Sequence, residues 1–283
     1  MEASFDPFSV PVRDAATVML LRDGDAGLEV FMLRRTMAAV FGPGFYVFPG
    51  GRVDLGDGSS AAEAACSGLD DTRASTMLGL DRGGLAFWVA AIRECFEEAG
   101  VLLAHDAAGE VVRFDDPVVG ARFAAHRDAL NAGATDLLSV CAAEGLTLDA
   151  GTMPYVAHWI TPIGERRRFD TRFLVARAPE AQDPLHDDAE TIESQWVQPR
   201  HALDAEAAGT MVLMPPTIAC LQMLTDFSAA GDALVEFAGR PAPAAVLPKI
   251  IGRGPKLVRL VLPGEPGYDE LELYTDLEAG DER

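Results

Sequence analysis

The chain has little lysine and no long apolar run. Its 23 basic residues include only two lysines, Lys249 and Lys256, and this bias, together with abundant alanine, is typical of a GC-rich bacterial genome. No apolar run approaches the roughly 20 residues that a membrane-spanning helix needs, and the N-terminus lacks the charged-then-apolar pattern of a secretory signal. The C-terminus carries no Ser-Lys-Leu peroxisomal signal. We therefore expect a cytoplasmic bacterial protein with no membrane partner.

Cysteine and histidine are scarce and show no metal-binding spacing. Cys66, Cys95, Cys141 and Cys220 form no C-x-x-C pair, which argues against a zinc site and against a disulfide framework. The five histidines show no H-x-x-x-H or H-E-x-x-H spacing. G-x-S-x-G, Walker A and G-x-G-x-x-G motifs are absent too, which argues against serine hydrolases, kinases and dehydrogenases.

Positive charge is also in short supply. The chain has 44 acidic and 23 basic residues and a net charge of −21. Because phosphate backbones require a basic surface, we expect no nucleic-acid partner. The one basic cluster is Arg166, Arg167 and Arg168, which either holds a substrate phosphate or forms a solvated turn.

An amphipathic helix is predicted to end at Gly100, a residue suited to the left-handed position after a last helical turn. Its apolar residues recur at i, i+3, i+4 and i+7, namely Leu85, Trp88, Val89, Ile92, Phe96 and Ala99. This stripe lies nearly opposite Glu94, Glu97 and Glu98. We therefore expect one side of the helix to be buried and the other to present carboxylates.

Glu94, Glu97 and Glu98 share one patch, because residues three and four apart are neighbours on a helix. Three carboxylates that close repel one another unless a positive charge neutralises them. A hard divalent cation with oxygen ligands suits that role, and Arg93 lies close enough to pair with Glu97. A solvated acidic helix face is the alternative interpretation.

A glycine-rich turn precedes this helix at Phe48, Pro49, Gly50 and Gly51. Phe-Pro-Gly-Gly followed by Arg-Glu-x-x-Glu-Glu-x-Gly resembles the Nudix box of the Nudix hydrolase superfamily. The sequence departs from that pattern in two ways. Asp57 stands where the family has its first glutamate, and an insert at 58–84 interrupts the box.

An interrupted box resembles the type-nineteen Nudix hydrolases, the acyl-coenzyme A diphosphatase branch. The resemblance extends over most of the chain from about Thr17 and includes residues 159–162, 167–173, 195–197, 215–216 and 247–264. It implies an α/β fold, a Nudix α/β/α sandwich with a mixed sheet and extra helical insertions. We expect a single domain over 1–283, with the insert at 58–84 and a helical elaboration at 115–150 that walls the substrate or forms a homodimer surface.

Local patterns place the elements of this fold along the chain. Strands are predicted at 15–21, 28–33, 45–48, 155–161, 168–176 and 193–197, with a terminal hairpin of 245–251 and 256–262. Helices are predicted at 85–99, 116–131, 134–144, 199–207 and 214–227, with a short one at 60–66.

The resemblance also implies a metal-dependent hydrolysis of a pyrophosphate linkage. The catalytic group would then consist of Arg93, Glu94, Glu97 and Glu98. Glu94 and Glu98 would bind Mg²⁺ or Mn²⁺ directly, with Glu97 as a further ligand, while Arg93 orients the carboxylates. Bound cations turn an acidic patch into a phosphate site, so the negative net charge is compatible with this chemistry.

Gly50, Gly51, Arg167 and Arg168 are the predicted substrate-binding residues. By resemblance the substrate is a small molecule, coenzyme A or acyl-coenzyme A, cut to 4′-phosphopantetheine or its acyl form and adenosine 3′,5′-bisphosphate. Val40 stands where some other coenzyme A diphosphatases have an arginine. Two alternatives stay open: an enzyme for nucleoside-diphosphate-linked substrates such as ADP-sugars, NADH or dinucleotide polyphosphates, and a non-catalytic regulator.

Overall fold

The computed structural model describes residues 6–38, 42–187, 190–251 and 259–275. Val40, the loop of the predicted terminal hairpin with residues 256–258 of its second strand, and both ends of the chain lie outside the described residues. The chain begins with a short 3-10 helix, η1 (Pro7–Ser9). No helix in these four described ranges combines the length and apolarity that crossing a membrane requires.

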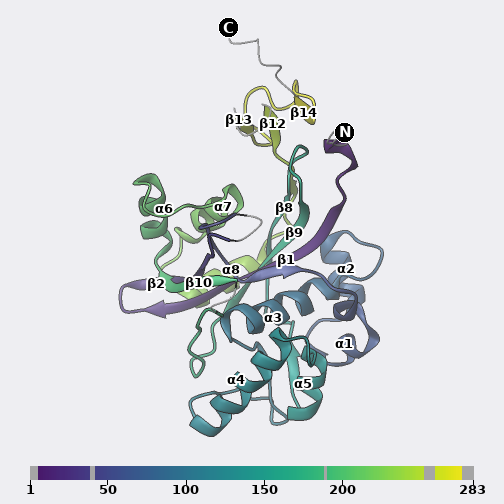
Figure 1. Ribbon diagram of the computed structural model, residues 1–283, viewed down its shortest axis with the longest axis vertical. Coiled ribbons are helices and arrows are strands. Elements are labelled where there is room, and N and C mark those ends of the chain that lie inside the picture. The colour runs from purple at the N-terminus through teal and green to yellow at the C-terminus, as the bar shows by residue number, and fades with distance from the viewer. Residues whose placement is uncertain (1–5, 39–41, 188–189, 252–258, 276–283) are drawn as a thin grey trace.

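A mixed eight-stranded sheet forms the centre of the fold (Figure 1). Its main path runs in the order β10 (Thr191–Val197), β2 (Gly27–Arg35), β1 (Val12–Gly24), β9 (Arg168–Arg177), β8 (Tyr155–Ile160) and β11 (Ala245–Val246). β1 runs parallel to β9 and β11 runs parallel to β8, whereas β1 and β2, β2 and β10, and β8 and β9 are antiparallel. Each strand predicted before residue 200 is confirmed, with ends shifted by a few residues.

Two short strands position the glycine-rich turn. The predicted strand at 45–48 is β3 (Tyr46–Val47), which pairs with β2, and β4 (Gly50–Arg52) then pairs with the first half of β1. Between them, the carbonyl of Pro49 accepts a hydrogen bond from Val18 N at 2.9 Å. The turn therefore lies against the central strand of the sheet.

Helices cover both faces of the sheet (Figure 1). α3 (Leu85–Ala99) lies on one side, and α6 (Pro199–Ala207), α7 (Pro215–Leu224) and α8 (Ala230–Gly239) cover the other. Successive side chains of a strand point to opposite faces, so Val18 joins the core with α3, while Met19 joins the core with α7. The predicted α/β/α sandwich is confirmed. The helix α8 was not predicted.

The insert at 58–84 contains more structure than the one predicted helix. After η2 (Leu55–Gly58) come α1 (Ser60–Ala64), β5 (Cys66–Ser67) and α2 (Asp71–Leu78). β5 forms a three-stranded sheet with β7 (Thr147–Asp149) and β6 (Ala104–His105). This small sheet ties the insert to the helical elaboration.

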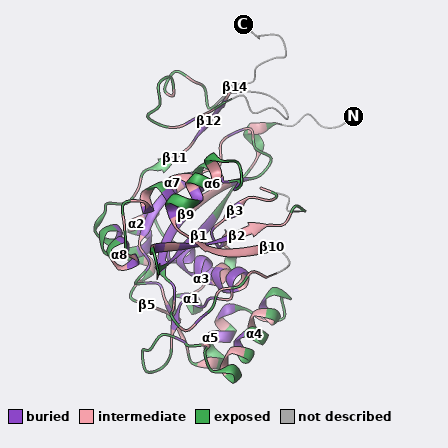
Figure 2. Cartoon of the chain, turned by 90° about the vertical axis from the view of Figure 1, so that its left-hand side faces the viewer, coloured by how far each residue is buried: buried purple, intermediate pink, exposed green. Residues whose placement is uncertain are grey.

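The elaboration consists of α4 (Pro117–Asn131) and α5 (Leu137–Glu144). α4 begins after Asp116, whose carboxylate accepts hydrogen bonds from the backbone N of Val118 and Val119. α5 begins three residues later than predicted, because Asp136 caps it by accepting from Ser139 N. Buried residues concentrate in the sheet and in α3, whereas α4 is mostly exposed (Figure 2). The single domain and the homodimer stay predictions.

The prediction of a terminal hairpin is partly wrong. The stretch 245–251 is divided between two sheets, because Ala245 and Val246 form β11 beside β8, whereas β12 (Lys249–Ile251) pairs with β13 (Arg259–Val261). The break falls at Pro248, which has no backbone N–H to donate to a ladder. β14 (Tyr274–Thr275) completes this second sheet.

Candidate active site

The insert holds the beginning of α3. Asp71 accepts hydrogen bonds from Gly83 N at 2.9 Å, just before the helix, and from Leu85 N at 3.0 Å, a first-turn donor that the helix itself leaves unpaired. Gly84 approaches α2 so closely that a Cβ there would lie 2.3 Å from Ser75 N. At the other end, Gly100 is in the left-handed region with φ 69°, as predicted.

The predicted apolar stripe of α3 is buried, but the expectation of an open carboxylate side is wrong. Glu98 is only 6% exposed, and the side chains of Glu94 and Glu97 are 14% and 23% exposed. The reason is that β4 and η2 pack against α3 on the side of these carboxylates.

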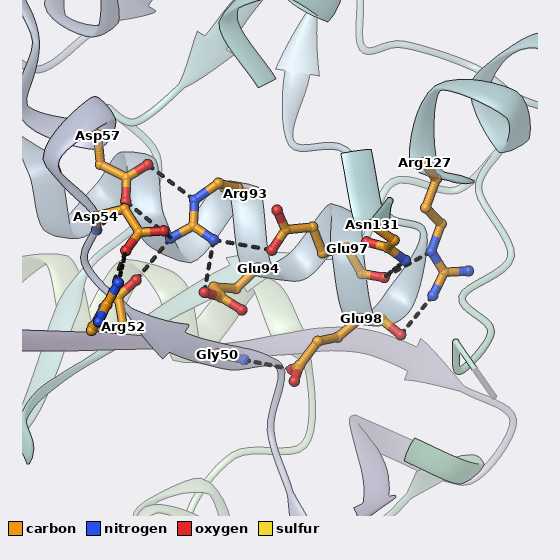
Figure 3. Close-up of polar contacts among 10 residues, drawn as sticks. All are labelled: Gly50, Arg52, Asp54, Asp57, Arg93, Glu94, Glu97, Glu98, Arg127 and Asn131. Carbon is orange, nitrogen blue, oxygen red and sulfur yellow. Dashed lines mark hydrogen bonds and ion pairs between the residues drawn. The ribbon is translucent and has the colours of Figure 1, made fainter. Parts of the chain in front are cut away.

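Glu94 and Glu98 lie against the two glycines of β4, and Figure 3 shows Glu98 at Gly50. Glu98 Oε2 accepts a hydrogen bond from Gly50 N at 2.9 Å. A Cβ on Gly51 would lie 2.5 Å from Glu94 Oε1, and a Cβ on Gly50 would lie 2.5 Å from Ala16 O. Glycine is therefore required at both positions for the strand and the carboxylates to approach each other.

Arg93 connects the two halves of the interrupted box. Its Nη1 donates to Glu94 Oε1 at 2.8 Å and to Glu97 Oε2 at 3.0 Å. Its Nε and Nη2 donate to the two oxygens of Asp57 at 3.1 and 3.0 Å, and Nη2 also donates to Arg52 O. Arg93 thus orients three carboxylates, and Asp57 faces the arginine rather than Gly50.

The charges of these carboxylates are costly to bury. Burial raises the pKa of Glu94 to about 7, although Arg93 opposes the shift. Burial also raises the pKa of Glu98 well above its usual range, and the charge of Glu94 adds to the effect. Burial raises the pKa of Glu97 as well, against the opposing charge of Arg93. A cation placed beside them would favour their charged forms.

The donor chemistry fits a hard divalent cation, which prefers carboxylate and other oxygen ligands. Glu94 and Glu98 lie one helical turn apart beside β4, whereas Glu97 turns towards Arg93 (Figure 3). No group of three or more His, Cys, Asp or Glu side chains converges as a ready metal site in the part of the chain that the structure describes. Glu94 and Glu98 would hold the cation beside β4. One oxygen of Glu94 and one of Glu97 accept from Arg93, and Glu97 as a further ligand stays a prediction.

The arginines predicted to bind substrate, Arg167 and Arg168, lie at the start of β9 and not beside the carboxylates of α3. Arg168 is buried and donates from Nε to Thr161 O at 3.0 Å, whereas Arg167 is exposed. The structure does not bring either side chain to the carboxylates of α3. Their role in substrate binding stays a prediction.

Two further groups lie near the site and were not among the predicted site residues. Arg35 Nη2 lies 3.8 Å from Glu190 Oε2, and both charges influence the pKa of Glu98. Arg127 and Asn131 of α4 donate to backbone carbonyls in the last turn of α3. No local signal marks Arg127 and Asn131, because their contacts depend on how distant segments pack.

The α/β/α sandwich, the glycine strand and the helix bearing Arg-Glu-x-x-Glu-Glu define a Nudix-type pyrophosphohydrolase. The chain belongs to the NUDT19 Nudix domain family, whose model matches residues 69–224. That range includes the carboxylates of α3. Gly50, Gly51 and Asp57 lie upstream of it, so the first half of the box rests on the geometry described above.

Known proteins agree with this assignment. The human acyl-coenzyme A diphosphatase NUDT19 is 28% identical over 278 residues, which cover 86% of this chain and 73% of the human protein. The protein of the same name from Gallus gallus is 27% identical and covers 93% and 81% of the two chains. A solved NUDIX hydrolase from Alicyclobacillus acidocaldarius, 29% identical, superposes with a TM-score of 0.64 over 82% of this chain and all of that one.

Proposed function

We propose that the chain hydrolyses the pyrophosphate linkage of coenzyme A or an acyl-coenzyme A in a reaction that needs Mg²⁺ or Mn²⁺. The products are 4′-phosphopantetheine, or its acyl form, and adenosine 3′,5′-bisphosphate. The observation that carries the reaction is the buried pair of Glu94 and Glu98 against Gly50 and Gly51. The choice of substrate is supported by the similarity to acyl-coenzyme A diphosphatases.

Each residue of the site has a distinct part in this proposal. Glu94 and Glu98 would hold the divalent cation, which would polarise a phosphoryl oxygen and lower the pKa of a bound water. Gly50 N fixes one oxygen of Glu98, and Arg93 fixes Glu94 and Glu97. Water attacks one phosphorus, a glutamate of this group takes the proton, and the bridging P–O bond breaks to leave two phosphate monoesters.

In this proposal, arginines away from the carboxylates of α3 extend the substrate site. Arg167 and Arg168 lie in the one arginine triplet of the sequence, and a guanidinium can bind a phosphate through two hydrogen bonds. The exposed side chain of Arg167 is available to a nucleotide phosphate. Gly50 and Gly51 shape the backbone beside the scissile linkage.

A product-resolved assay tests the function. The purified chain is incubated with Mg²⁺ and, separately, coenzyme A, an acyl-coenzyme A, ADP-ribose, NADH and a diadenosine polyphosphate. Release of adenosine 3′,5′-bisphosphate from the first two supports the proposal, and the release should stop with a chelator and in Glu98→Gln. Hydrolysis of ADP-ribose, NADH or the dinucleotide alone would assign the enzyme to nucleoside-diphosphate-linked substrates.

A third outcome would exclude an enzymatic function. If no substrate in the panel is cut, and one binds tightly to both the wild type and Glu98→Gln, the chain is a Nudix-fold regulator. Glu236→Gln is a matched control for charge removal, because Glu236 is an exposed residue of α8 that pairs with Arg240.

A further inference from the structure

Arg127 of α4 grips the end of α3 (Figure 3). Its Nε donates to the carbonyl of Glu97 at 2.9 Å, and its Nη2 donates to the carbonyl of Glu98 at 2.7 Å. The same Nη2 also donates to Leu185 O at 3.0 Å. One guanidinium thus joins α3, α4 and the segment that precedes β10.

These bonds complete the end of α3. The last four carbonyls of a helix have no partner within the helix. Gly100 N binds Phe96 O, and Leu185 N binds Ala99 O. Arg127 binds the two remaining carbonyls, of which Glu97 O also accepts from Asn131 Nδ2 at 3.3 Å, whereas Glu98 O accepts from Arg127 at 2.7 Å. The last turn of α3 contains no basic residue of its own. Arg127 therefore also supplies the positive charge that a helix C-terminus favours.

We propose that Arg127 is a positioning residue that sets the geometry of Glu97 and Glu98 for the divalent cation. This inference rests on the proposed function. Arg127 binds the main chain of the two residues whose side chains face Arg93 and Gly50. Fixing the backbone of Glu97 and Glu98 keeps the Glu98 carboxylate on Gly50 N. In this way α4 stabilises the positions of the carboxylates through the end of α3.

An arginine suits this position better than a lysine. The two acceptors are carbonyls of consecutive residues, and a planar guanidinium offers N–H groups in a fixed fork that reaches both, whereas an ammonium is a compact point charge. Gly100 leaves room for the group, since a Cβ there would lie 3.1 Å from Arg127 Nη1.

The surroundings of Arg127 allow chemical rescue. A cavity of about 330 Å³ is lined by Arg127 together with Phe96, Gly100, Phe114 and Phe123. If the side chain is shortened to alanine, a free guanidinium ion can enter through this cavity and bind the same carbonyls. In a variant that stays folded without guanidinium, recovery of metal binding on its addition separates a positioning role from a role in folding.

The test compares Arg127→Ala and Arg127→Lys with Arg122→Ala. Arg122 lies on the same helix but pairs with Glu144 of α5. Mn²⁺ binding is measured by titration calorimetry, and hydrolysis of coenzyme A is measured against Mg²⁺ concentration. Loss of a residue that orients metal ligands typically costs about 10–100-fold in metal affinity, and we expect that loss in Arg127→Ala, a smaller loss in Arg127→Lys and none in Arg122→Ala. Millimolar guanidinium should restore Mn²⁺ affinity to Arg127→Ala, whereas sodium chloride should not.

The outcomes separate this inference from the proposed function. Wild-type Mn²⁺ affinity in a folded Arg127→Ala overturns the inference, and so does an equal loss in Arg122→Ala. If Arg127→Ala does not fold, wild-type affinity in Arg127→Lys has the same meaning. If Mn²⁺ binding depends on Arg127 but coenzyme A is not cut, the inference stands and the proposed substrate fails. A wild type that binds no Mn²⁺ overturns both.

Discussion

Arg93 and Asp57 form a two-pronged ion pair across 36 positions of the chain, with N–O distances of 3.1 and 3.0 Å. Both side chains are nearly buried, at 12% and 6% exposure. Asp57 also accepts a hydrogen bond from Asp54 N at 2.8 Å, which folds η2 around the arginine. The pair joins the half of the Nudix box before the insert to the half after it. The two halves of the box therefore stay together although the insert separates them in the sequence.

Replacing Asp57 should therefore cost stability. In Asp57→Asn the amide nitrogen cannot accept from Arg93, and the buried guanidinium loses part of its compensation. Removing a charged partner of a buried hydrogen bond costs about 2–3 kcal/mol, measured as the change in free energy of unfolding in urea. Asp54→Asn is the control, because Asp54 is half-exposed and lies 3.8 Å from Arg93. Such a pair contributes less than about 1 kcal/mol, and equal costs for the two variants would contradict the proposed joining of the two halves.

Alanine at the two glycines should have different effects. A Cβ at position 51 meets the end of the Glu94 side chain, which can move, whereas a Cβ at position 50 meets the backbone of Ala16 and Thr17, which cannot. Gly51→Ala should fold normally and lose roughly 10–100-fold in activity by displacing a metal-holding carboxylate. Gly50→Ala should lower the urea midpoint instead.

Gly56→Ala serves as the control for both glycine variants, because nothing lies within 4 Å of a Cβ at Gly56. It should match the wild type in activity and in urea midpoint. An active Gly51→Ala would show that Glu94 can move from its place over β4 without loss of function.

Features with a local signal could be predicted from the sequence. The spacing of Trp88, Ile92 and Phe96 marks a helix whatever it packs against, and Gly100 marks its end. The clustering of carboxylates on that helix follows from the helical repeat alone. The placement of Glu98 does not, because its burial depends on β4, a strand of three residues.

Features that depend on contacts between distant segments could not be predicted. β5, β6 and β7 have two or three residues each, too few for an alternating pattern to appear. The sequence placed Asp57 in the box, but only the packing of η2 on α3 shows that it pairs with Arg93. The chain has 23 basic residues, of which two are lysines and 21 are arginines. Only the packing of α4 against the end of α3 distinguishes Arg127 from the other arginines.

The cap that Asp71 places on α3 should make stability depend on pH. Hydrogen bonds from Gly83 N and other backbone groups lower the pKa of Asp71 in the folded chain. For a lowered pKa, the stabilisation is present above the unfolded pKa of about 3.9 and is lost as pH falls through the folded value. At pH 7, Asp71→Ala should cost about 1 kcal/mol, the typical value for a lost helix cap.

Urea unfolding of the wild type and Asp71→Ala at pH 7 and at pH 3 checks this expectation. The difference between the two proteins should shrink at the lower pH, because the wild-type cap is then partly protonated. Asp70→Ala is a comparison within the same loop, since Asp70 caps α2 through Arg73 N rather than α3. A difference for Asp71→Ala that grows on acidification would contradict the assigned sign.

Metal should stabilise the wild type through Glu98 and should fail to do so when that charge is removed. A ligand that binds only the folded state at a hundredfold excess over its Kd adds about 2.7 kcal/mol to the free energy of unfolding. We expect this gain from Mn²⁺ in the wild type, and we expect a chelator to abolish it. In Glu98→Gln the gain should largely disappear, and kcat should fall about a hundredfold or more, as for loss of a group that holds the catalytic metal.

Without metal, the order of stability should reverse. Glu98→Gln replaces a buried carboxyl group, which is costly to ionise, by a neutral amide whose oxygen can still accept from Gly50 N. At pH 8 in chelator, this variant should therefore be at least as stable as the wild type, whereas in excess Mn²⁺ the wild type should be the more stable. Urea midpoints under the two conditions measure the crossover. If Mn²⁺ raises the midpoints of both proteins equally, the cation binds without Glu98 and the assigned site is wrong.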